Sequence, residues 1–318
     1  MGVSSYPNGW KNGVVVKGVP LEIPNPGKVF WVNNSGVIPQ GGIGGSDSND
    51  GTYLRPFSTI DAAIGKCTAN RGDVIYVMPG HSETITADSE VDFDVAGVRC
   101  IGLGHGGKMA QINFNATAAT VAVGADDVVI QNMRFTADVS AVVDGIVVED
   151  GVDDGVIRDC VFDVVLAATD EFVDSISFVN DNTRWLVEGC TFDMALGGAA
   201  SAVHMDQDTD KLTIRGNVMR GDYSIGNIIG STTLSTNLDI DGNLLENGDG
   251  SNLNAQPCID LVGVSSTGTI RNNYLVCNLS TKGAAIVAAN CLLFENYYNE
   301  DVSSSGTGGI IGTASADD

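Results

Sequence analysis

Two pairs of aspartates have a spacing that could support chemistry. Asp126-Asp127 and Asp153-Asp154 are 27 residues apart, and each pair begins four residues before an isoleucine, Ile130 or Ile157. If the chain repeats with this period, the four carboxylates stack on adjacent turns of the backbone. Carboxylate oxygens are ligands that Ca²⁺ prefers, so these four aspartates are the candidate metal ligands of the sequence.

The residues at the same position of the next periods leave two interpretations open. Thr183-Arg184 and Asp210-Lys211 come next, so an arginine or lysine base could face a calcium site, as in a polysaccharide lyase. In the other interpretation, the aspartates form a solvated acidic turn whose charge Arg184 and Lys211 neutralise. We favour the second interpretation. It predicts no catalytic residue and no cofactor, with Ca²⁺ as the alternative.

Histidines do not indicate a second site. The sequence has three of them, and His204 lies in a predicted strand with no serine or cysteine nucleophile that can be assigned to it. We expect an outward strand position for His204. His105 lies between Gly104 and Gly106, which predicts a residue in a glycine-rich turn.

A short repeat must position these residues. Seven segments share a pattern: an aliphatic residue, any residue, a small or amide residue, then Cys, Asn or Met, any residue, and a large apolar residue. The segments begin at Ile130, Ile157, Val187, Ile214, Ile240, Ile270 and Leu293, with spacings of 27, 30, 27, 26, 30 and 23 residues. A period that varies by a few residues is typical of a solenoid whose fixed core carries loops of different length.

The third and fourth positions of the repeat predict how each turn is made. Asn, Asp or Gly occupies the third position in six copies, with Glu295 as the exception, and these residues best tolerate a left-handed backbone. The fourth position holds a sulfur-containing residue in three copies and asparagine in four. Stacked inside the solenoid, the asparagines would form a structural ladder of amide hydrogen bonds. They are Asn217, Asn243, Asn273 and Asn296.

Strands that precede the repeat complete the predicted fold. Ile146, Ile176, Val203 and Ile259 each lie 11 residues before the copy that follows them. Together these strands predict an all-β, right-handed, single-stranded parallel β-helix. A short helix in 57–67, begun by a capping box of Ser58 and Asp61, would cover the first coil. We expect an extended arm over residues 1–27, a cap and first coil over 28–80, and the β-helix body over 81–318.

Charge and cysteine content restrict the partners of the chain. The formal net charge is −24 and the pI is about 4.1; residues 1–28 carry +2, so the remainder carries −26. An acidic body repels nucleic acid and anionic membranes, and no apolar run is long enough to span a bilayer, so neither partner is predicted. Seven dispersed cysteines without a CxxC pair indicate buried thiols rather than disulfides or a zinc site.

The chain resembles known β-helix proteins over about residues 27–300, and segments near its start carry the resemblance. The order of 45–52 (GSDSNDGT), 56–64 (PFSTIDAAI) and 72–80 (GDVIYVMPG) is similar to the beginning of pectate-lyase-like β-helices. With 6–10 (YPNGW) and 26–32 (PGKVFWV), the chain resembles a group of β-helix proteins of tailed bacteriophages, including trimeric head cement or decoration proteins. His105 and its two glycines resemble the histidine motif of polygalacturonases, but the Arg-x-Lys of that family is absent.

The phage resemblance implies a non-enzymatic virion protein on the head surface, made in the cytoplasm of the bacterial host. Its partners would be the major capsid protein and two further copies in a homotrimer. The arm combines lysines, apolar residues and prolines, which suit docking in an extended form. The docking residues would be Tyr6, Trp10, Lys11, Val14, Val16 and Lys17. Two alternatives stay open: a tailspike-type or secreted polysaccharide lyase or hydrolase, and a non-catalytic receptor-binding fibre module.

Overall fold

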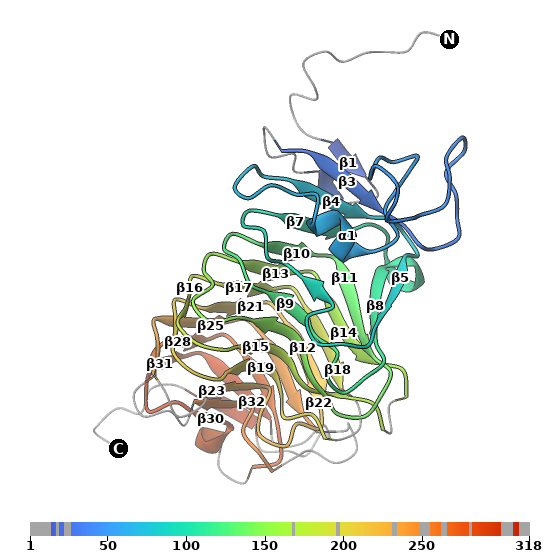
Figure 1. Ribbon diagram of the computed structural model, residues 1–318. Helices are drawn as coiled ribbons and strands as arrows, with labels where there is room; N and C mark the ends of the chain where they lie inside the picture. Colours follow the sequence, from blue (N-terminus) through green and yellow to red (C-terminus); the bar gives the residue numbers. More distant parts are fainter. Residues whose placement is uncertain are drawn as a thin grey trace.

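The computed structural model describes most of the chain as one rod of stacked coils (Figure 1). The described residues are 14–16, 19–21, 27–166, 169–194, 198–230, 234–248, 255–261, 266–279, 282–299 and 308–311. Within them, each coil contributes one strand to each of three sheets, and eight coils are complete between β4 and β30. The sequence prediction of a right-handed parallel β-helix is confirmed.

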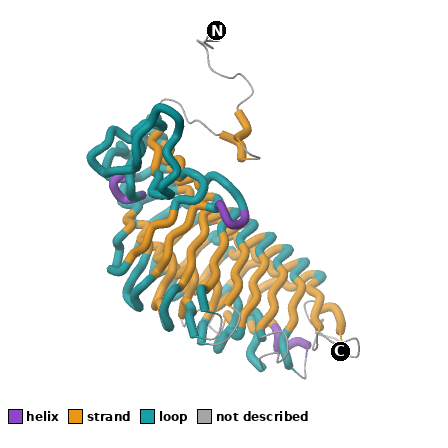
Figure 2. The backbone as a smooth tube through the Cα atoms, turned by 90° about the vertical axis from the view of Figure 1, so that its right-hand side faces the viewer, coloured by secondary structure: helices purple, strands orange, loops and turns teal. Residues whose placement is uncertain are grey.

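Sheet 1 contains the first strand of each coil, and Figure 2 shows the strands of the rod stacked in parallel rows. Its strands, in spatial order, are β3 (Val29–Val32), β4 (Val74–Val77), β7 (Arg99–Gly102), β10 (Val129–Gln131), β13 (Val156–Arg158), β17 (Leu186–Glu188), β21 (Thr213–Arg215), β25 (Leu238–Asp241), β28 (Thr267–Arg271) and β31 (Asn290–Phe294). All neighbours in this sheet are parallel, as expected when each strand returns one coil later.

Sheets 2 and 3 follow in the same order along the rod. Sheet 2 comprises β5 (Ser82–Ile85), β8 (Ala110–Phe114), β11 (Met133–Ala137), β14 (Val161–Val164), β18 (Thr191–Met194), β22 (Val218–Gly221), β26 (Leu244–Asn247), β29 (Tyr274–Val276), β32 (Asn296–Asn299) and the antiparallel β33 (Gly308–Ile311). Sheet 3 comprises β6 (Val91–Asp92), β9 (Val121–Val123), β12 (Val142–Val148), β15 (Phe172–Phe178), β19 (Ser201–Met205), β23 (Ile228–Gly230), β27 (Ile259–Leu261) and β30 (Ile286–Val287).

A small fourth sheet lines the turn between sheets 3 and 1. It contains β16 (Asn182–Thr183), β20 (Thr209–Asp210) and β24 (Ser235–Thr236). Two 3-10 turns complete the described elements, η1 (Gly106–Lys108) and η2 (Lys282–Ala285). No helix in the described part of the chain is long and apolar enough to cross a membrane.

The strand register follows the repeat read from the sequence. Ile130 pairs with Ile157, and the first residues of the later copies continue the same column inside the rod. The third position has a positive φ in all seven copies, including 48° at Glu295, which the sequence marked as the exception. A left-handed residue in each coil turns the chain from sheet 1 to sheet 2, and the stack enforces it even on glutamate.

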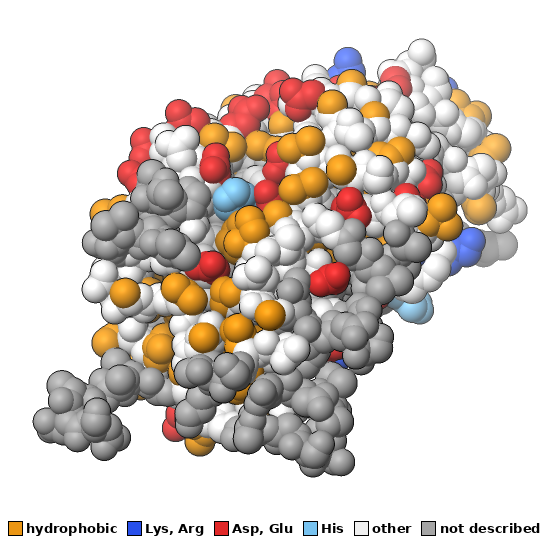
Figure 3. Space-filling model, turned by 90° about the horizontal axis from the view of Figure 1, so that it is seen from below, with side chains coloured by type: hydrophobic (Ala, Val, Ile, Leu, Met, Phe, Trp, Pro, Cys, Tyr) orange, Lys and Arg blue, Asp and Glu red, His pale blue; other side chains and the backbone are white. Residues whose placement is uncertain are grey.

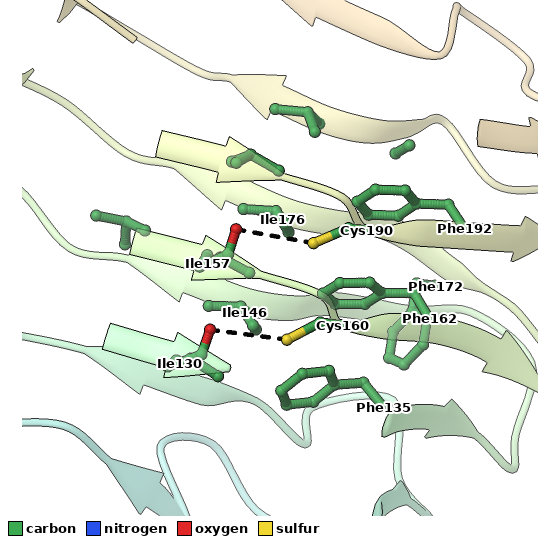
Figure 4. Close-up of a cluster of buried hydrophobic side chains, with 14 of the residues drawn as sticks. Ile130, Phe135, Ile146, Ile157, Cys160, Phe162, Phe172, Ile176, Cys190 and Phe192 are labelled. Carbon is green, nitrogen blue, oxygen red and sulfur yellow. Dashed lines mark hydrogen bonds between the residues drawn. The ribbon is translucent and has the colours of Figure 1, made fainter. Parts of the chain in front are cut away.

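Aromatic rings fill the interior of the first coils beside this turn. Phe135, Phe162 and Phe192 stack with ring centroids 4.9 Å and 4.7 Å apart (Figure 4). All three side chains are buried, and Phe172 of sheet 3 packs against Phe162 edge-on at 6.3 Å. One ring per coil therefore forms a continuous column, because neighbouring coils superpose equivalent positions.

The asparagines of the later coils form the ladder that their spacing predicts. Asn243 Nδ2 donates to Asn273 Oδ1 at 2.9 Å and to the carbonyl oxygen of Ile214, also at 2.9 Å. Asn217 and Asn273 make the equivalent bonds one coil before and one coil after, and Asn296 ends the row. The four side chains are almost completely buried, so every amide proton must find a partner inside the protein.

A short helix covers the first coil, but its N-terminus differs from the prediction. Helix α1 spans Ile60–Ile64, and Thr59, not Ser58, is the N-cap, accepting the N–H of Ala62 at 3.3 Å. The predicted capping box of Ser58 and Asp61 is therefore wrong by one residue. Glu83 explains the shift, because its carboxylate on sheet 2 accepts the N–H of Ile60 at 3.0 Å and holds the helix start from outside.

The segment before the rod contains an antiparallel hairpin of β1 (Val14–Val16) and β2 (Val19–Leu21). We expected an extended arm that pairs with a partner, whereas these two strands pair with each other. They form a two-stranded sheet of their own, beyond the N-terminal end of the rod (Figures 1 and 2). Pro20 is tolerated in β2 because both strands of a two-stranded sheet are edge strands.

Candidate functional site

The stacked aspartates lie at the turn between sheets 3 and 1, one coil apart. Asp126 Oδ1 accepts the N–H of Asp153 at 2.9 Å, and Asp153 Oδ1 accepts the N–H of Thr183 at 2.8 Å. Asp127 and Asp154 have positive φ values of 58° and 61°. The spacing therefore predicts the stacking correctly, but these carboxylates satisfy the backbone of the next coil and allow the chain to turn.

Arg184 continues this row and pairs with the aspartates before it. Its guanidinium contacts Asp154 through two bonds of 2.5 and 2.7 Å and Asp153 through one of 3.2 Å. The hydrogen bond from Arg184 holds the pKa of Asp154 below its usual range. Arg184 is thus engaged in charge-assisted hydrogen bonds with both aspartates of the preceding coil.

The next turn holds a lysine that pairs with an aspartate of its own coil. Lys211 Nζ lies 2.8 Å from Asp210 Oδ2, while Thr236 and Asn237 donate to Asp210 Oδ1, each at 2.6 Å. These three hydrogen bonds, that of Lys211 foremost, lower the pKa of Asp210 to about 2. Among the described residues, no group of three or more His, Cys, Asp or Glu side chains is placed to hold a metal ion.

A shallow groove of about 370 Å³ runs beside the first aspartates. Asp127 and Asp154 line it together with Arg99, and the rest of its wall is mainly glycine and valine. The groove brings both charge signs together without a histidine or a nucleophile. His105 lies elsewhere, exposed in the turn before η1, as the flanking glycines predict.

A second polar group lies on sheet 3, where consecutive coils carry β-bulges. The N–H groups of Ala202 and Val203 both donate to the carbonyl of Asn227, at 3.0 and 3.1 Å, and those of Asn227 and Ile228 both donate to Cys258. A bulge inserts one residue and reverses the alternation of side chains beyond it. Ser201 and His204, three residues apart on β19, consequently share one face of the sheet.

His204 is held by a carboxylate from the preceding coil. Its Nδ1 lies 2.9 Å from Asp174 Oδ2, and the Ser201 hydroxyl donates to the other oxygen of Asp174 at 2.6 Å. Asp144, one coil earlier, accepts a hydrogen bond from Ser177, which pairs in register with His204. We call these five residues the His204 cluster: Asp144, Asp174, Ser177, Ser201 and His204.

Burial and neighbouring charges shift two pKa values in the His204 cluster. Burial raises the pKa of Asp144 despite the hydrogen bond from Ser177, and the charge of Asp174 raises it further. Burial acts to lower the pKa of His204, but the hydrogen bond to Asp174 and the charges of Asp174, Asp206 and Asp144 raise it overall. One carboxyl group and one imidazole are therefore both biased towards holding a proton.

The arrangement could transfer protons. Because Asp174 accepts the proton on Nδ1, Nε2 is the ring nitrogen that can release or take up a proton, and Asp206 Oδ1 lies 3.9 Å from it. A carboxyl group with a raised pKa and an oriented imidazole together form an acid–base pair that recurs in proteins. Asp174 and Ser177 are largely buried, however, so a ligand would reach His204 first.

The sequence predicts the outward position of His204 but not its neighbours. Strand alternation alone assigns no serine to His204, whereas Ser177 and Ser201 both belong to the cluster. The register of Ile176 with Val203 was known, so Ser177 could have been placed opposite His204. Asp144 and Asp174 could not, because strict alternation puts them on the inward face of Ile146 and Ile176, whereas in the structure they contact Ser177 and His204.

The predicted docking residues cannot be placed in full. Tyr6, Trp10, Lys11 and Lys17 lie outside the described residues, and Val14 and Val16 belong to β1, of which only the backbone is described. The geometry of a capsid contact therefore stays a prediction.

Stacked coils, left-handed turns and internal ladders define the molecule as a parallel β-helix protein. Residues 43–293 match the family described as "Protein of unknown function (DUF1565)", and the chain belongs to that family. It is also similar to a solved structure described as a rhamnogalacturonan lyase, with 14% sequence identity and a TM-score of 0.46, over 88% of this chain and 78% of that chain. No curated protein matches the chain.

Proposed function

We propose that the protein is a structural virion component, a cement or decoration protein that attaches to a bacteriophage head as a homotrimer. The observation that carries the proposal is the separate hairpin of β1 and β2, which has no strand pairing with the three sheets of the rod. A rod that completes its own hydrogen bonds can present such a segment to a partner without losing its core.

The surface chemistry of the rod supports a structural role. On the outer face of sheet 1, Arg215 pairs with Glu188 at 2.7 Å, and Arg271 lies 3.1 Å from both Asp239 and Asp241. These basic groups are engaged with carboxylates of adjacent coils. Figure 3 shows a face on which acidic side chains recur and basic ones lie near the margin, a surface that disfavours anionic ligands.

Co-sedimentation with undecorated capsids tests the proposal. A chain that starts at Gly27 keeps β3 and every coil, so we expect an unchanged melting temperature but loss of capsid binding. Three arms on one trimer bind with far higher avidity than one arm, so the full-length protein should sediment at concentrations where the shortened chain stays in solution. Equal sedimentation of both proteins would contradict docking through the arm and would favour attachment through the rod or a receptor-binding fibre.

The His204 cluster favours a second candidate function, cleavage of a polysaccharide. A proton-holding carboxyl group and an oriented imidazole could serve as acid and base. The acidic body disfavours anionic chains, so neutral polysaccharides are the substrates to test first. Release of reducing ends that is lost in His204→Gln, but kept in the exposed control His105→Gln, would replace the structural proposal with an enzymatic one. Equal, background-level release of reducing ends by the wild type and both variants would leave the structural proposal in place.

A further inference from the structure

The loop between β3 and α1 exposes an unusual amount of apolar surface. Five of its large hydrophobic side chains are 43–68% exposed, and they fall within an 18-residue stretch. The described residues include 16 exposed large hydrophobic side chains, so almost a third of them gather in this one loop. We call it the apolar loop and define it by Val37, Ile38, Ile43, Tyr53 and Leu54.

The apolar loop is held in place by the backbone of the rod's first strand. Trp31 of β3 donates its N–H to Gly51 at 2.8 Å and accepts the N–H of Phe57 at 2.9 Å, while Ile43 donates to Leu54 at 2.9 Å. The Tyr53 ring meets the Trp31 ring edge-on, with centroids 5.0 Å apart. A loop ordered by its own hydrogen bonds cannot easily bury its apolar side chains, and binding it costs little conformational entropy.

Charge distinguishes this end of the molecule from the rest. Residues 1–57 contain four basic residues and three acidic ones, a net charge of +1. Because the whole chain carries −24, residues 58–318 carry −25. A basic partner would be attracted to the flanks of the rod rather than to this end. An acidic protein surface, in contrast, is repelled by the flanks of the rod but not by this end, and an uncharged surface is repelled by neither.

We propose that the apolar loop and the hairpin of β1 and β2 form one docking surface, and that its occupant is a protein surface with an apolar centre and a neutral or acidic rim. The hairpin and the loop lie at the same end of the rod (Figure 1), so one partner can contact both. Exposed apolar patches of this kind mark protein contacts. The inference rests on the proposed function, in which the occupant is the outer surface of the capsid.

Binding of loop variants to undecorated capsids tests the inference. Val37→Ser with Ile38→Ser removes two exposed apolar side chains from the loop, and we expect capsid affinity to fall at least about tenfold. Val165→Ser with Leu166→Ser is the matched control, because these two side chains are 52% and 61% exposed on a turn of the rod. The control should bind within about twofold of the wild type, and both variants should keep its melting temperature.

The outcomes separate this inference from the proposed function. If the wild type binds capsids and the loop variant binds equally well, the docking role of the loop is wrong while the proposed function stands. If the wild type does not bind, the proposed function fails, and the assigned occupant with it. Sedimentation of the free proteins covers the remaining case: a loop variant that alone loses its oligomeric state would make the loop a contact between copies and overturn the inference.

Discussion

The coils before and after Cys190 close the same turn with different chemistry. Up to Cys190 the inward residue is sulfur-containing: Cys160 Sγ lies 3.8 Å from the carbonyl oxygen of Ile130, and Cys190 Sγ lies 3.7 Å from that of Ile157 (Figure 4). From Asn217 onwards an amide takes this place and donates to the equivalent carbonyl at about 3 Å. The carbonyl oxygen at the first position of the repeat is thus contacted in both regions, by a thiol in the earlier coils and by an asparagine amide in the later ones.

The difference shows what each coil relies on. The asparagines also connect to one another: Asn243 Oδ1 accepts both the backbone N–H and the side-chain amide of Asn217, at 2.9 and 3.0 Å. A thiol is a weak donor and offers no such link. The earlier coils compensate with stacked phenylalanines, whereas the same inward column of the later coils holds Met219, Leu245 and Leu275. Packing dominates the first region and hydrogen bonding the second.

The largest loss of stability is expected when a stacked ring is removed from the first region. Phe162→Ala should lower the free energy of unfolding by about 3–5 kcal/mol, because Phe162 contacts a stacked ring on each side and the cavity cannot collapse against two fixed coils. Phe162→Leu should cost clearly less. Chemical denaturation measures both, and a loss below about 1 kcal/mol for Phe162→Ala would show that the stack is not what supports these coils.

The ladder of the second region comes next. Asn243→Ala leaves two donors of Asn217 without their acceptor and removes the side-chain donor to the Ile214 carbonyl, at an expected cost of about 1–3 kcal/mol. Cys190→Ala at the equivalent position should cost no more than about 1 kcal/mol. Asn115→Ala, at an exposed asparagine, is the control and should stay within about 0.5 kcal/mol. Equal shifts of the denaturation midpoint for Asn243 and Asn115 would remove the distinction between the regions.

A pH effect should distinguish the polar face of sheet 3 from both core regions. The pKa of His204 is raised in the folded protein, so its contribution to stability is present below the unfolded pKa and is lost as the pH rises through the folded value. The melting temperature of His204→Gln should therefore lie furthest below that of the wild type in mildly acidic buffer, below about pH 6.5. His105→Gln, in the exposed turn, should show no such dependence. A constant difference across pH would contradict the His204–Asp174 interaction.

The smallest effect is expected at the solvent-exposed aspartate turn. Arg184→Ala should lower stability by less than about 1 kcal/mol, and added salt should remove most of the difference, because Arg184 and both aspartates are partly exposed. Millimolar Ca²⁺ should leave the wild-type melting temperature unchanged. A clear rise with Ca²⁺ that Asp127→Asn with Asp154→Asn abolishes would restore the calcium site as an explanation of these residues.

Sequence spacing alone predicted the stacking of equivalent positions, the left-handed turns and the asparagine ladder. In a solenoid, neighbours in space are neighbours in the period, so residues such as Asn217 and Asn243 could be paired without coordinates. The same logic placed Asp126 above Asp153. The spacing could not predict what the carboxylates bind. Whether Asp153 accepts a backbone N–H or binds an ion depends on distances of a few tenths of an ångström.

Only the tertiary structure decided the features that break the period. A bulge on sheet 3 puts Ser201 and His204 on one face, and Asp144 and Asp174 join them in the His204 cluster although alternation places both in the core. Glu83, more than 20 residues away in the sequence, moves the start of α1 by one residue. Val14 pairs with Leu21 of the same chain instead of with a partner protein. Each case joins groups whose contact the repeat does not encode, because one inserted residue or one long-range hydrogen bond outweighs local sequence preference.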